Sequence, residues 1–174
     1  MIKKTVLLIS ILSTVSLVAC KSMDHGSGQK ASAVLDSRSG SNATGTVNFL
    51  WQGHDVLVTA TFSGLKPNSE HGFHVHEKGD CSAPDATSAG GHFNPDAKSH
   101  GQPGSGANHA GDMPNIKTDG NGNATYSAKL SGFAVNNGPS GILGRSVVVH
   151  RDPDDYKSQP AGNSGPRIAC GSIK

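Results

Sequence analysis

Aromatic and charged residues are both scarce in this sequence. Aromatic residues make up 5% of the 174 residues and charged residues 16%, and the formal net charge is +2 with neutral histidines. No lysine- and arginine-rich stretch interleaved with aromatic residues occurs, so no nucleic-acid partner is expected. No apolar pattern of helical period extends over a useful length either, which argues against a helical bundle.

Long apolar runs are also lacking, apart from one near the start of the chain. This run, Thr5 to Ala19, follows Lys3 and Lys4 and is shorter than the ~20 residues of a membrane-spanning helix. A basic start before a short apolar run is typical of a signal peptide, which we expect over residues 1–19. The run ends in LVAC, which resembles the lipobox of bacterial lipoproteins. A plain secretory leader with an incidental cysteine is the alternative.

Lipidation of Cys20 would place the protein in the cell envelope or periplasm, held to a membrane. More than one acyl chain gives stable anchoring. Residues 20–30 are polar and without periodicity, which predicts a flexible tether between the anchor and the folded domain.

Cysteine is rare, with three residues in the chain. If Cys20 is lipidated, Cys81 and Cys170 remain as one pair, and disulfides persist in exported proteins. Two buried free thiols are the alternative.

Glycine, in contrast, is abundant, with 23 residues, and it serves turns while weakening helices. Short runs rich in β-branched residues predict strands near 33–36, 46–51, 56–62, 72–77, 124–130, 145–150 and 167–173, with a weaker one near 115–118. Seven or eight such strands predict a single all-β domain over residues 31–174, an antiparallel Greek-key barrel or sandwich. Residues 80–113 lack periodicity, and we expect a long loop held by metal ligands and by Cys81.

Histidine is concentrated in one part of the chain. Six of the nine histidines lie between His71 and His109, and His150 follows three valines. His74 and His76 in GFHVHE are two residues apart, so on a strand they point to one side, ~6.6 Å apart along it. Imidazole is a common ligand of copper and zinc, and Asp112 adds a carboxylate. The cluster therefore predicts a metal centre.

Six segments in this order resemble the copper/zinc superoxide dismutase family: GFHVHEKGDC, GGHFNP, SHGQP, HAGD, GRSVVVHRDPDD and GNSGPRIACG. The resemblance covers essentially residues 30–174. It implies a Greek-key β-fold and an enzyme that converts superoxide to dioxygen and hydrogen peroxide at a copper centre. It leaves the oligomeric state open, with a homodimer among the options.

Residue by residue, the resemblance implies one copper and one zinc per chain. It assigns copper to His74, His76, His92 and His150. It assigns zinc to His92, His100, His109 and Asp112, so that His92 bridges both metals and takes a proton during the reaction. Four nitrogens suit Cu(II), and three nitrogens with one carboxylate suit tetrahedral Zn(II).

The resemblance also assigns residues around the metals. Asp154 is expected to join a copper histidine to a zinc histidine, and Cys81 and Cys170 to form a disulfide. Arg167 is expected beside the open copper position, where its guanidinium binds superoxide. His71 matches a packing residue of the family and is not a predicted ligand.

Two other functions compete with the enzyme. One is a non-catalytic envelope protein that binds copper and zinc, and Arg167 argues against it because metal storage needs no anion site. The other is a β-domain with one structural zinc. The histidines of GFHVHE together with His150 argue against it, because one zinc needs only four ligands.

Overall fold

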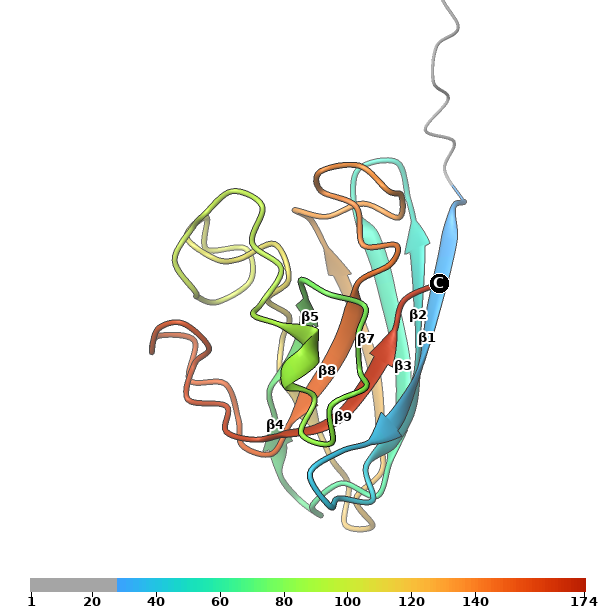
Figure 1. Ribbon diagram of the computed structural model, residues 1–174, viewed down its shortest axis with the longest axis vertical. Helices are drawn as coiled ribbons and strands as arrows, with labels where there is room; N and C mark the ends of the chain where they lie inside the picture. Colours follow the sequence, from blue (N-terminus) through green and yellow to red (C-terminus); the bar gives the residue numbers. More distant parts are fainter. Residues whose placement is uncertain (1–27) are drawn as a thin grey trace, which may run out of the picture.

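The computed structural model describes residues 28–174, which form a curled antiparallel β-sheet (Figure 1). Its strands in chain order are β1 (Lys30–Ser37), β2 (Thr44–Trp51), β3 (Val56–Ser63), β4 (Glu70–His71), β5 (Phe73–His76), β6 (Ile116–Lys117), β7 (Ala124–Leu130), β8 (Ser146–His150) and β9 (Arg167–Ser172). Within the described part of the chain the only helical element is a short 3-10 turn, Thr87–Ala89. The predicted all-β fold is confirmed.

The predicted signal peptide and Cys20 lie outside the described residues, as does most of the predicted tether. The domain boundaries therefore stay predictions. Within residues 28–174, no helix is long and apolar enough to cross a membrane.

The strand order is that of a sheet folded back on itself. Seven strands are hydrogen-bonded in the order β5-β8-β9-β1-β2-β3-β7, and β4 pairs separately with β6. Strand β1 pairs with β2 from Lys30 to Leu35 and then with β9 at Asp36 and Ser37, so it belongs to both halves of the curled sheet. Neighbours that are distant in sequence, such as β9 and β1, are the mark of Greek-key connections.

Alternation along the strands builds the core between the two halves. In β3 the side chains of Val56, Val58, Ala60 and Phe62 are buried, while the intervening residues are exposed or half-buried. The ends of the sheet meet across this core. Phe73 of β5 packs edge-to-face against Phe62 of β3, with ring centroids 5.3 Å apart, and against Tyr126 of β7, at 5.1 Å. Such aromatic contacts add to the free energy gained from area burial.

Strands β5 and β8 are buried on both faces along their whole length, and β9 is buried in the same way except at its two ends. Phe73 and Val75 point into the core, whereas His74 and His76 lie on the opposite face and are still fully buried. On that same outer side, Val148 of β8 packs in a second, small apolar cluster with Ala86, Ala89 and Cys170. The outer face is thus covered by the connection between β5 and β6, the long loop that the sequence predicts.

Two long connections, after β5 and after β8, lie on the same side of the sheet (Figure 1). The first is tied to the sheet by a disulfide between Cys81 and Cys170 of β9, whose Cα atoms are 5.8 Å apart, within the usual range. The Nε of Arg38, in the β1–β2 turn, donates to the carbonyl of Cys81 (2.9 Å). The predicted disulfide is confirmed.

The disulfide generates a prediction about stability. It closes a loop with a sequence separation of 89 residues. Replacing both cysteines, Cys81→Ser with Cys170→Ser, should lower the free energy of unfolding of the metal-free protein by about 2–4 kcal/mol, because the unfolded chain gains freedom. Urea unfolding measures this. A reductant should bring the wild type to the stability of the variant and leave the variant unchanged. Equal stability of the two oxidised proteins would contradict the prediction.

Candidate metal centre

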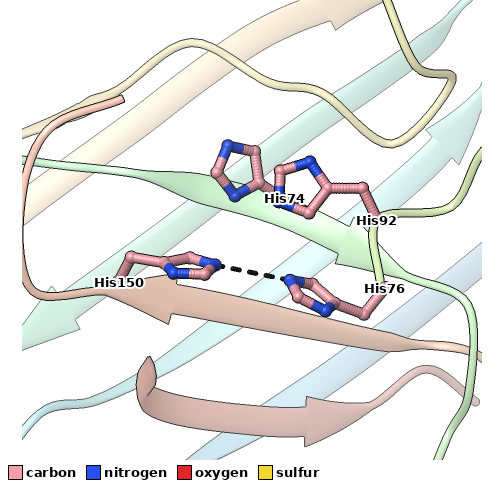
Figure 2. A group of neighbouring side chains, drawn as sticks. All are labelled: His74, His76, His92 and His150. Carbon is pink, nitrogen blue, oxygen red and sulfur yellow. Dashed lines mark hydrogen bonds between the residues drawn. The ribbon is translucent and has the colours of Figure 1, made fainter. Parts of the chain in front are cut away.

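The first group of candidate ligands lies on the outer face of β5 and β8. His74 and His76 come from β5, His150 ends β8, and His92 lies on the covering connection. One nitrogen from each ring lies within 4.8 Å of the others, and all four side chains are buried. Figure 2 shows the four rings gathered above the two strands. The same-face placement of His74 and His76 follows from their spacing on the strand.

The far nitrogen of three of these rings is already engaged. His74 Nε2 lies 2.8 Å from Asp154 Oδ2, His76 Nδ1 lies 3.0 Å from the Gly90 carbonyl, and His150 Nδ1 lies 3.1 Å from the Gly165 carbonyl. Carbonyls and carboxylates only accept hydrogen bonds, so these nitrogens carry the protons of the neutral rings. The other nitrogen of each ring is then a lone pair, which is the state of a metal ligand.

Two of these lone pairs face each other. The Nε2 atoms of His76 and His150 are 3.4 Å apart, the contact drawn as a dashed line in Figure 2. A hydrogen bond there would require one ring to carry protons on both nitrogens and hence a positive charge. Burial lowers the pKa of both histidines well below the usual value, and so opposes that charge. A cation between the two nitrogens resolves the conflict.

Orphaned nitrogens point to the same conclusion. Among the described residues, the buried atoms Nδ1 of His74 and Nε2 of His92 have no hydrogen-bond partner. Burial lowers the pKa of His74 and lowers that of His92 to about 4, so both rings are neutral near pH 7. Buried polar atoms are rarely left without a partner. Together with the facing lone pairs, they form a four-nitrogen set that fits a copper ion.

The second group surrounds the carboxylate of Asp112. Its Oδ1 lies 2.9 Å from His92 Nδ1, 3.0 Å from His100 Nδ1 and 3.4 Å from His109 Nδ1. The contact with His100 lacks the alignment of a hydrogen bond, and His100 Nδ1 has no partner within residues 28–174. Three nitrogens and one oxygen, all from buried residues and within 4.8 Å of one another, fit a tetrahedral zinc ion.

Main-chain groups orient the Asp112 carboxylate. Its Oδ2 accepts the N–H groups of His109 (2.8 Å) and Gly101 (3.2 Å), which leaves Oδ1 toward the imidazoles. Although burial alone would raise the pKa of Asp112, the neighbouring imidazoles hold it well below its usual range. The carboxylate is therefore ionised and can bind a cation.

His92 belongs to both groups. Its Nδ1 lies 2.9 Å from Asp112 Oδ1 and 3.5 Å from His109 Nδ1. Its Nε2, on the other edge of the ring, is the orphaned atom of the first group. The ring also stacks on His74, with centroids 3.9 Å apart.

Asp154 joins the two groups from behind. Its Oδ2 contacts His74 Nε2 (2.8 Å) and its Oδ1 contacts His100 Nε2 (2.9 Å). The side chain of Asn115 holds the main chain of Asp154 by two hydrogen bonds, accepting its N–H (2.9 Å) and donating to its carbonyl (3.0 Å). A Cβ at position 162 would overlap Oδ1 of Asp154, so glycine is required at Gly162. Although burial lowers the pKa of His100, the ionised carboxylates of Asp112 and Asp154 raise it to about 9.

Arg167 lies beside the first group. Its guanidinium donates to the carbonyls of Ala86 and Gly90, each at 2.6 Å, and the Gly90 carbonyl also accepts the Nδ1 proton of His76. The residue is half-buried and has no ion-pair partner within 4.0 Å among residues 28–174; burial lowers its pKa, and the more distant carboxylate of Asp85 acts in the opposite direction. Its positive charge is therefore available to an anion.

The structure places the remaining histidines outside both groups. His71 is buried, and its Nδ1 contacts the carbonyl of His150 (3.0 Å). His54 is exposed beside Asp55. The sequence prediction missed Asn115 and the carbonyls of Gly90 and Gly165. Main-chain acceptors carry no residue-type signal, and Asn115 lies in a segment that indicates only a weak strand.

Sequence comparisons relate this chain to a family of known proteins. The sequence profile of the family "Copper/zinc superoxide dismutase (SODC)" matches residues 43–173. A superoxide dismutase [Cu-Zn] of Aquifex aeolicus is 43% identical over 149 residues, covering 83% of this chain and 86% of the relative. One from Cordyceps militaris is 45% identical over 149 residues, covering 81% and 96%.

A solved structure of similar shape supports the fold. The crystal structure of a double mutant of a SOD-like protein from Bacillus subtilis has a TM-score of 0.73 and 34% sequence identity, covering 81% of this chain and 95% of that one. The family match spans most of the described residues, and both relatives exceed 40% identity over most of their length. The chain therefore belongs to the copper/zinc superoxide dismutase family.

Proposed function

We propose that this copper/zinc superoxide dismutase, which uses one copper and one zinc, holds copper with His74, His76, His92 and His150. In the same proposal, zinc is held by His92, His100, His109 and Asp112, and His92 is shared. Two observations support the sharing. His92 is a member of both groups, and its two nitrogens lie on the two sides where the metals are expected. When bound, copper supplies one-electron chemistry, and zinc supplies a fixed positive charge.

Arg167 is the residue that favours an enzyme over a metal-binding protein. Superoxide is a small anion, and a fixed guanidinium next to His76 can attract and orient it. Its contacts with two carbonyls hold the guanidinium in place before the substrate arrives, so little reorganisation is needed. Storage of a metal needs no such charge.

The reaction also needs protons, because two superoxide ions and two protons give one dioxygen and one hydrogen peroxide. We assign one of these protons to Nε2 of His92, the atom without a hydrogen-bond partner among the described residues. Nδ1 of the same ring lies 2.9 Å from Asp112 Oδ1, on the side proposed for zinc, so that His92 and Asp112 would bind the same ion. Asp154 keeps His74 in the tautomer whose Nδ1 is a lone pair.

We infer that the protein is exported, with which the Cys81–Cys170 disulfide is consistent. Lipidation of Cys20 and anchoring to a membrane of the envelope remain predictions from the sequence, as does a homodimer.

Arg167 is tested by substitution. Arg167→Ala should keep both metals and lower superoxide consumption about tenfold to a hundredfold, because an attractive charge raises encounter rates by about that much. The loss should shrink the salt dependence of the rate. Arg167→Lys should fall between, since lysine keeps the charge without the planar fork. Metal analysis and pulse radiolysis measure these effects.

Arg151→Ala is the matched control, because Arg151 is exposed and paired with Asp152 (3.0 Å). It should behave as the wild type. Equal rates for Arg167→Ala and the wild type, with both metals bound, would remove Arg167 from the mechanism.

The sharing of His92 is tested by comparing three alanine variants. His92→Ala should weaken the binding of both metals, His76→Ala that of copper alone, and His109→Ala that of zinc alone. Each loss should exceed the roughly 10–100-fold cost of removing an outer hydrogen-bond partner. Titrations against competing chelators measure the affinities. If His92→Ala weakens only one metal, the residue is not shared.

A further inference from the structure

Gln159, on the connection between β8 and β9, forms two hydrogen bonds with the main chain of His100. Its Oε1 accepts the N–H of His100 (2.8 Å), and its Nε2 donates to the carbonyl of His100 (2.9 Å). The side chain thus bonds to one residue much as a neighbouring strand would. It crosses from one long connection to the other.

Among the described residues, the main chain of His100 has no hydrogen-bond partner other than Gln159. The residue is 3% exposed, and within residues 28–174 no other group bonds to its N–H or its carbonyl. Residues 94–115 contain no strand or helix, and four glycines follow His100 between residues 101 and 111. Glycine leaves the chain free to move, so a side chain must supply the restraint that a sheet would give.

The position of His100 matters at both of its ring nitrogens. Nδ1 lies 3.0 Å from Asp112 Oδ1, and Nε2 lies 2.9 Å from Asp154 Oδ1. A shift of the main chain would move both contacts together. Asn115, on the other long connection, forms the same pair of hydrogen bonds with the main chain of Asp154. Each long connection thereby holds a residue of the other.

We propose that Gln159 is a positioning residue for the zinc site, acting on the metal through His100. The inference rests on the proposed assignment of His100 to zinc. Gln159 bonds only to the main chain of His100 and of Lys157, and not to a ring or carboxylate of either metal group. Gln159 is exposed, so a substitution at this position leaves the core intact.

Asn163 supplies a matched control on the same connection. Its amide donates to Asp155 Oδ2 (3.2 Å) and Ser158 Oγ (2.8 Å), and both bonds stay within that connection. Its φ of 52° suits glycine, so Asn163→Gly removes the amide without strain. This variant loosens the connection without touching His100.

The test uses the full chain loaded with copper and zinc. Gln159→Met should release zinc to a competing chelator about tenfold more readily than the wild type, the scale for losing an outer partner of a metal ligand, while copper is retained. Gln159→Glu should fall between, because a carboxylate still accepts the N–H of His100 but cannot donate to its carbonyl. Asn163→Gly should behave as the wild type. The absorption spectrum of Co(II) bound in the zinc site should differ from that of the wild type in Gln159→Met. It should be unchanged in Asn163→Gly.

Three results would overturn the proposal. Zinc retention equal to that of the wild type in both Gln159 variants would show that the hydrogen bonds between Gln159 and His100 do not contribute to zinc binding. Equal zinc loss from Asn163→Gly would assign the effect to the connection as a whole. A wild type that binds no zinc would overturn the zinc assignment itself, and this inference with it. If Gln159→Met does not fold, Gln159→Glu alone decides between these results.

Discussion

Hydrogen bonds on the far side of each imidazole are the interactions on which this metal centre depends. A neutral histidine has one proton, and the acceptor at one nitrogen decides that the other is a lone pair. Asp154 makes this choice for His74, and the carbonyls of Gly90 and Gly165 make it for His76 and His150. The lone pairs are left facing one another in a buried space. A cation bound by these lone pairs accounts for the arrangement.

This dependence explains why so much of the chain serves to hold loops. Only His74, His76 and His150 lie on strands, whereas their acceptors and the second group lie on the two long connections. Isolated bridges join His92 and Asp112 to β5, but the described parts of these connections form no longer ladder. Three other features restrain these connections. They are the disulfide between Cys81 and Cys170, the small apolar cluster next to it, and the hydrogen bonds of Asn115 and Gln159 from one connection to the main chain of the other. Restraint of the loops and tuning of the metal centre are therefore the same task.

The sequence predicted the fold and the candidate ligands, for physical reasons that can be named. Alternating β-branched residues revealed strands such as β3, and the spacing of His74 and His76 placed both on one face. The order of six short segments, and not any single one, carried the family resemblance. What it missed depends on three-dimensional contacts. The role of the Gly90 carbonyl cannot be predicted from the sequence, because every residue has a carbonyl. The hydrogen bonds of Gln159 to His100 cannot be predicted either, because a surface glutamine is usually solvated.

The most direct test of the account is superoxide consumption by the purified full chain after removal of all metal and stepwise return. The protein should show no activity with zinc alone and rapid consumption once one equivalent of copper is added to the zinc-loaded protein. Metal analysis of the same samples should find one copper and one zinc per chain. If the protein binds both metals in this ratio and still leaves superoxide unconsumed, it is a metal-binding protein and not a superoxide dismutase.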